Sequence, residues 1–224
     1  MFRQRGCEST RRSFCSGEAR EDRHECGGSA VGLMPSVGQL RFRPQLDKIV
    51  ELLLYLSHVR PNADKYQAVK FLYLADKEHL NRYGRPITFE TYYALRYGPI
   101  ATHAMDLLER DATVMADAGI EELPFEVEDL DKITYIRAPK RAVDHEMFSK
   151  SDLAVFDEIL KKYGKLTFDQ LYQLTHSHFA YKNAWDKRRR GANRAEMSYD
   201  DMVDETARKQ DLINDISPVS QHMR

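Results

Sequence analysis

The sequence predicts a mainly α fold of the α+β class: a single compact helical domain of about seven helices with a small β-hairpin or strand element. Three observations predict it. Apolar residues recur every three or four positions in several segments, which is the period of an α-helix. A run rich in threonine and tyrosine follows one of these segments and is typical of a strand. The chain shows no internal repeat and no regular alternation of strand and helix, which argues against a solenoid or a parallel-sheet α/β fold.

The first two helices can be placed from their apolar period and their capping residues. One is expected over residues 46–59, and the next runs from its N-cap, Asp64, to about Arg82. The second is apolar on every side, which is typical of a helix buried at the centre of a domain. Gly84 and Pro86 end it, because neither residue continues a helix well.

After the second helix the pattern changes. Residues 88–97 are rich in Thr, Phe and Tyr and are expected to be extended. A third helix is expected over 101–118, ended by Gly119. Apolar residues alternate on either side of an acidic turn within 123–137, which predicts a β-hairpin.

Four further helices are expected after the hairpin. Ser151 is expected to cap the first of them, and Thr167 to begin the second. The third covers residues 180–187, around Trp185, and Ser198 begins the last. These segments complete the count of about seven helices.

Residues 1–40 are expected to form a disordered tail ahead of a domain that covers 41–216, with a C-terminal tail over 217–224. The N-terminal segment contains few large apolar residues, so it buries too little surface to offset the entropy lost on ordering. Met34 directly precedes the domain and is an alternative start of translation. The three cysteines all fall in this tail: Cys7, Cys15 and Cys26. Their odd number fits a reducing compartment, and their spacing matches no paired C-x-x-C metal site.

The composition suits a soluble protein. Of 224 residues, 42% are hydrophobic, which is enough for a sizeable core. Lys and Arg number 34 against 35 Asp and Glu, so no net field attracts nucleic acid or an anionic membrane. No apolar run reaches the roughly 18 residues that span a bilayer, and no apolar segment follows the N-terminal charges as in a signal peptide. We therefore expect a cytoplasmic protein without a membrane partner.

The residues that could carry chemistry form no familiar catalytic or metal site. The expected domain contains these histidines: His79, His103, His145, His176 and His178. None belongs to an H-E-x-x-H motif, and no G-x-S-x-G elbow or phosphate-binding G-x-x-x-x-G-K motif occurs. His176 and His178 come nearest to a pair, but residues two apart point in different directions on a helix. We expect no cofactor and no enzymatic activity, and a hydrolase or metal enzyme is the most distant alternative.

Asp76, Lys77 and Glu78 end the most apolar run and allow two interpretations. They could form a small polar site. They could equally be the solvated last turn of a helix, because ionisable side chains are seldom fully buried without a partner.

The order helix, helix, strand, helix and hairpin is similar to that of a winged-helix DNA-binding domain. The helix expected over 101–118 carries one Arg110 against four acidic residues: Asp106, Glu109, Asp111 and Asp117. A recognition helix needs a basic or neutral polar face to approach DNA, so this pattern disfavours nucleic acid as a partner. The one basic run, 187–190, lies in an expected loop. A DNA-binding regulator of its own operon is the second function class.

Tyrosines around the expected strand are candidates for a protein interface, because aromatic rings with a polar end suit both cores and interfaces. In an extended segment Tyr92 and Arg96 share one face, and Tyr93 and Tyr97 share the other. We expect one face to be core and the face of Tyr92 and Arg96 to be accessible. The predicted partner-binding residues are Tyr92, Arg96, Tyr83 and Tyr97.

Several short sequence words resemble one known family. They are Y-L-A-D-K-E-H (73–79), R-Y-G-R-P-I-T (82–88), Y-Y-A-L-R-Y-G-P-I (92–100), L-T-H (174–176), K-N-A-W (182–185) and M-S-Y-D-D-M (197–202). Together they resemble the Panacea or SocA-like antitoxin domain of bacteria and phages, a family that includes phage-associated GepA-like proteins. The similarity covers most of the expected domain. Where the family usually has Trp a few residues after the Thr-His pair, this chain has Tyr181, and Trp185 follows later.

The resemblance implies a function. A domain of this family is mostly helical and neutralises a co-encoded protein toxin by binding it directly. One member presents its toxin to a bacterial AAA+ protease. The resemblance implies no cofactor, no turnover and no catalytic residue, and the toxins of the family differ, so their chemistry does not transfer. The leading interpretation is therefore an antitoxin whose partners are a co-encoded toxin and, in the adaptor form, a AAA+ protease.

We expect a chain that begins at Met34 to fold like the full chain, because residues 1–33 lack core-forming side chains. The melting curves of the two chains, followed by circular dichroism, should nearly coincide. A much lower melting temperature of the shorter chain would contradict the expectation.

Overall fold

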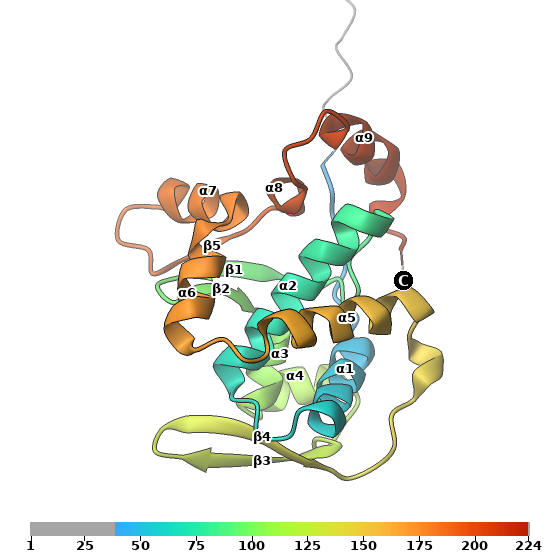
Figure 1. Ribbon diagram of the computed structural model, residues 1–224, viewed down its shortest axis with the longest axis vertical. Coiled ribbons are helices and arrows are strands. Elements are labelled where there is room, and N and C mark those ends of the chain that lie inside the picture. Colours follow the sequence, from blue (N-terminus) through green and yellow to red (C-terminus); the bar gives the residue numbers. More distant parts are fainter. Residues whose placement is uncertain (1–38, 224) are drawn as a thin grey trace, which may run out of the picture. The chain divides into compact units, whose positions relative to one another are not determined.

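A long buried helix, α2 (Lys65–Tyr83), runs through the middle of this computed structural model, which describes residues 39–223 (Figure 1). Its N-cap, Asp64, accepts a hydrogen bond from the backbone N–H of Gln67 at 2.7 Å. The helix ends at Gly84, whose φ of 75° lies in the left-handed region that glycine adopts without strain. Both ends of the helix and its burial on every side were predicted correctly.

Helix α1 (Leu46–Val59) also has the bounds that its apolar period predicts. The loop that joins it to α2 is fixed by two backbone hydrogen bonds to Ile136, which lies in a hairpin described below. The N–H of Asn62 donates to the Ile136 carbonyl at 2.8 Å, and the N–H of Ile136 donates to the Ala63 carbonyl at 2.9 Å. The hairpin therefore lies against the start of α2.

The prediction of a single helix over 101–118 is wrong, because two short helices occupy this range. They are α3 (Thr102–Leu108) and α4 (Ala112–Asp117). Arg110 lies between them with a φ of 59°, a left-handed conformation that interrupts the helical hydrogen-bond ladder. The side chain of Asp111 then caps α4 by accepting from two backbone N–H groups.

The extended segment expected over 88–97 is shorter than predicted, because Phe89 has a φ of 57° and the regular strand begins only at Tyr92. Strand β1 (Tyr92–Leu95) is the middle of a three-stranded antiparallel sheet with the order β2-β1-β5. Its neighbours, β2 (Gly98–Ala101) and β5 (Arg194–Glu196), were not predicted.

The β-hairpin predicted within 123–137 is confirmed. It consists of β3 (Phe125–Leu130) and β4 (Ile133–Pro139), which pair only with each other among the described strands. The turn residues Asp131 and Lys132 have φ values of 48° and 69°. Two consecutive positive φ angles match the two-residue hairpin turn whose twist suits the paired strands.

The four helices expected after the hairpin are present. They are α5 (Lys150–Tyr163), α6 (Phe168–Ser177), α7 (Phe179–Lys187) and α8 (Tyr199–Met202), and a 3₁₀ turn, η1 (His145–Met147), precedes them. The cap of α5 is Ser149 and not Ser151. Ser149 forms a capping box with Asp152, in which each side chain accepts a hydrogen bond from the other residue's backbone N–H.

Helix α9 (Lys209–Ser220) was not predicted. With it and the division of the third expected helix into two, nine α-helices lie within residues 39–223, where about seven were expected. The expected C-terminal tail begins inside this helix, which contains Pro218. Its Ile216 packs against the end of α2, since a Cβ at Gly84 would lie 3.1 Å from Ile216 Cδ1. Burial of Ile213 and Ile216 stabilises this helix, although the proline inside it cannot donate a backbone hydrogen bond.

The structure describes Gln39 and Leu40 of the expected N-terminal tail, and Leu40 belongs to the core. Leu40 is 4% exposed, and its N–H donates to the Asp200 carboxylate at 2.8 Å. The rest of that tail, with Met34 and the three cysteines, lies outside the described residues.

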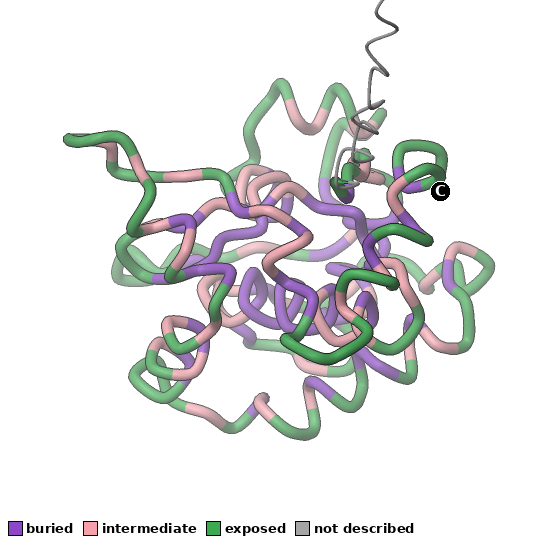
Figure 2. The backbone as a smooth tube through the Cα atoms, turned by 90° about the horizontal axis from the view of Figure 1, so that it is seen from above, coloured by how far each residue is buried: buried purple, intermediate pink, exposed green. Residues whose placement is uncertain are grey.

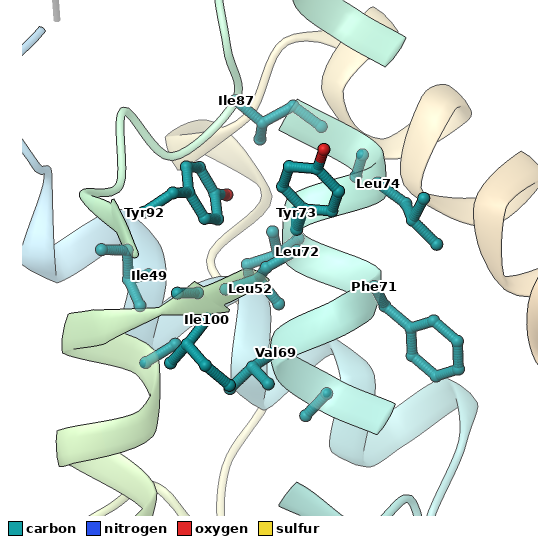
Figure 3. Packing of buried hydrophobic residues seen from close by; sticks show 14 of the residues in the cluster. Ile49, Leu52, Val69, Phe71, Leu72, Tyr73, Leu74, Ile87, Tyr92 and Ile100 are labelled. Carbon is teal, nitrogen blue, oxygen red and sulfur yellow. The ribbon is translucent and has the colours of Figure 1, made fainter. Parts of the chain in front are cut away.

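The core surrounds α2, which packs against α5, α3, α6, α8, β2 and β4. In Figure 3, Phe71 and Leu74 point to one side of α2, and Ile49 and Tyr92 lie on the other side. Figure 2 shows the buried positions gathered at the centre and the exposed ones in the outer helices and loops. No helix in the described part of the chain is both long and apolar enough to span a membrane.

Asp152, at the start of α5, joins four parts of the chain through one buried carboxylate. Its oxygens lie 2.8 Å from Lys48 Nζ on α1, 3.1 Å from His79 Nε2 on α2 and 2.7 Å from the Arg85 guanidinium. Burial alone would raise the pKa of Asp152. Hydrogen bonds from His79 and Lys48 and the charges of Lys48 and Arg85 outweigh burial and hold that pKa well below its usual range.

We predict that Asp152→Asn lowers the free energy of unfolding at pH 7 by about 3 to 5 kcal/mol, because it leaves the buried Lys48 ammonium without its counter-ion. The depressed folded-state pKa means that the unfolded chain takes up the proton first. The stabilisation is thus present above the unfolded-state pKa, about 3.9, and is lost as the pH falls through the folded-state value.

Urea unfolding at several pH values measures the free energy of unfolding of the wild type and of Asp152→Asn. The difference between the wild type and Asp152→Asn should be largest near neutral pH and should narrow below about pH 4. The exposed Asp186→Asn is the control and should unfold like the wild type. A difference that stays constant with pH would contradict the prediction.

Candidate functional site

Asp76 on α2 fixes the segment that follows the helix. Its carboxylate is fully buried and accepts hydrogen bonds from the N–H groups of Ile87 (2.8 Å) and Thr88 (2.9 Å) and from the hydroxyls of Thr88 (2.5 Å) and Tyr92 (2.8 Å). Burial raises the pKa of Asp76, and these four hydrogen bonds oppose the shift. For Asp76 the interpretation as part of a solvated last turn is therefore wrong. Lys77 and Glu78 are only partly buried and pair with Asp204 and Arg82, so the three side chains do not form one polar site.

Tyr92 consequently lies in the core, and the prediction that it is accessible is wrong. It is 1% exposed, and its ring centre lies 5.4 Å from that of Tyr73 (Figure 3). The alternating pattern correctly separates two faces of the strand, but it does not say which one is buried. The hydrogen bond from Tyr92 to Asp76 places the face of Tyr92 and Ala94 inward.

The other three predicted partner-binding residues are exposed, and they lie in two places. Arg96 and Tyr97 form the turn between β1 and β2, where the guanidinium lies 5.7 Å from the centre of the Tyr97 ring. Tyr97 is 53% exposed and Tyr83 is 54% exposed. Tyr83 ends α2, about 20 Å along the helix axis from Lys70, the residue of α2 that contacts the turn. The structure thus brings Arg96 and Tyr97 together and leaves Tyr83 apart.

Lys70 holds this turn from inside the domain. Its ammonium is buried, donates to the Pro99 carbonyl at 2.6 Å and lies 4.7 Å from the centre of the Tyr66 ring. No carboxylate of the described residues forms an ion pair with it. Desolvation therefore lowers the pKa of Lys70 well below its ordinary value.

Gly98 allows the turn to approach Lys70 closely. Its φ of 98° is a conformation that other residues rarely adopt. A Cβ at this position would lie 2.9 Å from Lys70 Nζ and 3.0 Å from Thr175 Oγ1. Both the conformation and the close approach therefore favour glycine, and the turn lies directly against Lys70 of α2 and Thr175 of α6.

His176 on α6 completes the contact. Its Nε2 lies 3.2 Å from the Arg96 carbonyl and its Nδ1 lies 2.8 Å from the Tyr172 carbonyl. Burial lowers the pKa of His176, and a neutral imidazole donates to one of these carbonyls at a time. We call these contacts the Lys70 cluster: Lys70, Gly98, Pro99, Thr175 and His176. The sequence words Y-G-P-I and L-T-H thus meet in one place.

His178 belongs to a different contact. It lies between α6 and α7, and its Nδ1 is 3.1 Å from the Tyr73 hydroxyl. Burial, with a smaller effect of the Lys77 charge, lowers the pKa of His178 to about 4. His176 and His178 therefore do not converge. Within residues 39–223 no three His, Cys, Asp or Glu side chains are grouped closely enough to hold a metal ion.

Aromatic side chains form one continuous row that begins at the surface and includes His176 of the Lys70 cluster. We call this row the aromatic strip: Tyr97, Phe168, Tyr172, His176, Tyr181 and Trp185. Successive ring centres lie between 3.6 and 6.3 Å apart. Phe168 and Tyr97 are about half exposed, at 48% and 53%, whereas Tyr181 is buried and donates to the Leu95 carbonyl at 2.9 Å. The Arg188 guanidinium lies 4.0 Å from the Trp185 ring and ends the row.

Sequence reasoning missed most of this surface, although the signal was present. Phe168, Tyr172 and His176 are four residues apart on α6, and Tyr181 and Trp185 are four apart on α7. Side chains at this spacing share one face of a helix. The spacing predicts two aromatic faces, but only the packing of α6 against α7 and against the β1–β2 turn joins them into one row.

The family model described as antitoxin SocA-like, Panacea domain, matches residues 69–186. The match covers more than half of the chain. The chain belongs to this family. The SocA-like Panacea match begins one residue before Lys70 and ends one residue after Trp185, so it contains the Lys70 cluster and the whole aromatic strip. Searches of curated proteins and of solved structures find no match.

We predict opposite behaviour for two tyrosines of the same segment. Tyr92→Phe should lower the free energy of unfolding by about 1.5 to 3 kcal/mol, because it removes a hydrogen bond to a buried carboxylate. Tyr97→Phe, at an exposed position, should change it by less than about 0.5 kcal/mol. Denaturant unfolding of both variants measures the difference. Equal effects would contradict the burial of Tyr92.

Proposed function

We propose that this SocA-like Panacea protein is an antitoxin that neutralises a co-encoded protein toxin by binding it directly. Its family supports the antitoxin role, and the observation that supports direct binding is the aromatic strip with Arg96 beside it. We further propose that the protein acts as a binding protein and not as an enzyme.

The strip suits a protein interface for two reasons. Tyrosine, tryptophan and arginine are the residues that most often contribute large shares of binding energy at interfaces. The backbone beneath them is also fixed: Lys70 and His176 hold the β1–β2 turn against α2 and α6. A surface that is ordered before binding loses less conformational entropy when the partner arrives.

The chain is close to neutral, so we expect the complex to depend more on desolvated aromatic contacts than on long-range charge. Raising the salt concentration should therefore weaken it little. Arg96 and Tyr97 remain proposed partner-binding residues, and Tyr83 is a proposed outlying one. Tyr92 is not, because it is buried.

Presentation of the bound toxin to a AAA+ protease is the finer form of the proposal. Its support is the resemblance to the family alone. It would show as a shorter toxin lifetime in cells that contain both the antitoxin and the protease. The DNA-binding alternative gains no support, because the helix expected to read DNA is divided into α3 and α4 and carries acidic side chains.

The test is co-expression of the protein with the products of its neighbouring genes, followed by pull-down and a measurement of Kd. We expect one such product to be toxic alone and harmless in the complex. Tyr97→Ala, Phe168→Ala and Arg96→Ala should weaken binding, with at least one variant losing about 30-fold, which corresponds to about 2 kcal/mol. Their melting temperatures should change little.

Two controls separate binding from folding, and one further variant tests the extent of the interface. Val219→Ala, on α9, removes a side chain of similar exposure (49%) outside the strip and should bind normally. Leu72→Ala, fully buried, should instead destabilise the fold by about 2 to 5 kcal/mol. Tyr83→Ala tests whether the interface reaches the end of α2. If all three strip variants bind normally, the strip is not the interface, and if no neighbouring product binds, the antitoxin proposal fails.

A further inference from the structure

A groove that shares no residue with the aromatic strip runs along the β3–β4 hairpin. It has a volume of about 1000 Å³ and is lined by the α1–α2 loop, by α4 and the segment after it, and by both strands of the hairpin. An adjoining hollow of about 620 Å³ lies along α4 and the residues after it. It shares Arg110, Met115 and Glu121 with the first groove. Together they form one continuous surface, which we call the hairpin groove.

The floor of the hairpin groove is apolar. Met115, Leu123, Phe125 and Val127 line it. Leu123 and Phe125 are buried, whereas Met115 and Val127 are covered only in part. Helix α4 has no fully buried residue, so its apolar side is only partly covered by the rest of the described chain. Apolar side chains of a partner would find incompletely covered apolar surface here.

The rim of the groove is acidic. The segment 106–131 contains ten Asp and Glu residues and one basic residue, Arg110. The cations in the lining are already paired: Arg110 with Asp129, Arg137 with Glu128, and Lys140 with Glu122. Two exposed glutamates of the lining, Glu121 and Glu126, have no ion-pair partner among the described residues. Glu121 and Glu126 therefore give the rim negative charge that no cation of the lining compensates.

We propose that the hairpin groove binds a helical segment of another protein, one that carries apolar residues on one face and Lys or Arg along the borders of that face. The apolar residues occupy the floor at Met115 and Val127, and the basic residues meet Glu121 and Glu126. This is the arrangement by which an amphipathic helix lies in a groove, and complementary charge sets its orientation. The acidic rim repels nucleic acid, so a basic protein segment is the occupant that fits.

The proposal does not depend on the antitoxin role of the strip, and its test uses defined peptides with the full-length protein. The probe is a fluorescein-labelled, alanine-based helical peptide of about 18 residues, with leucines on one face and lysines at the borders of that face. A second peptide replaces the lysines with glutamates. A third replaces the leucines with serines. Binding is followed by fluorescence anisotropy at low salt, where surface charges are least screened.

The variants test the rim. In Glu121→Lys/Glu126→Lys the two unpaired glutamates become lysines, and the matched control, Asp211→Lys/Asp215→Lys, makes the same change of net charge at exposed positions on α9. Melting curves confirm that both variants fold. The wild type should bind the leucine–lysine peptide at least about tenfold more tightly than either of the other peptides.

Glu121→Lys/Glu126→Lys should bind the leucine–lysine peptide about tenfold more weakly than the wild type and the leucine–glutamate peptide more tightly. The control variant, Asp211→Lys/Asp215→Lys, should bind each peptide within about twofold of the wild-type affinity. Hydrogen exchange should slow in residues 121–128 when the peptide is bound. The proposal is overturned if the leucine–lysine peptide does not bind, if the three peptides bind alike, if both variants lose affinity equally, or if protection falls outside this segment.

Discussion

The burial of α2 on every side is the constraint on which the rest of the structure depends. A helix in this position carries its ionisable side chains inside the domain, where each one is costly unless it finds a partner. Lys70 bonds to Pro99, Asp76 bonds to the segment that ends at Tyr92, and His79 meets Asp152. Each partner belongs to a different part of the chain, so the polar groups of one helix determine where its neighbours lie.

The candidate interface follows from the same constraint. The β1–β2 turn is fixed because Lys70 donates to its backbone, and α6 is fixed against the turn because His176 contacts the Arg96 carbonyl. Tyr97 and the ring of Phe168 then lie side by side at the surface, with centres 6.3 Å apart. The exposed end of the aromatic strip, at Tyr97 and Phe168, thus lies next to a contact in which the polar side chains of Lys70 and Thr175 are fully buried.

The sequence predicted features that depend on a few neighbouring residues: the capped ends of α2, the extent of α1 and the hairpin turn. The sequence did not predict features that depend on contacts between residues far apart in the chain. The inward orientation of Tyr92 depends on Asp76, and α9 depends on packing against the end of α2. The break at Arg110 is local, but a positive φ at an arginine has no clear sequence signal. For the aromatic strip, the four-residue spacing on α6 and on α7 could be recognised in the sequence. That the two aromatic faces pack against each other could not.

The Lys70 cluster separates the buried residues that hold this surface in place from the exposed side chains of the surface itself. Lys70, Gly98 and Thr175 are buried and pack closely against one another. The exposed Tyr97 and Phe168 are not among these buried contacts. Substitutions at the exposed positions can therefore change the chemistry of this face without loss of the scaffold. The chemistry of the exposed face can thus change through single steps that each leave a folded protein, so the surface can evolve faster than the architecture beneath it.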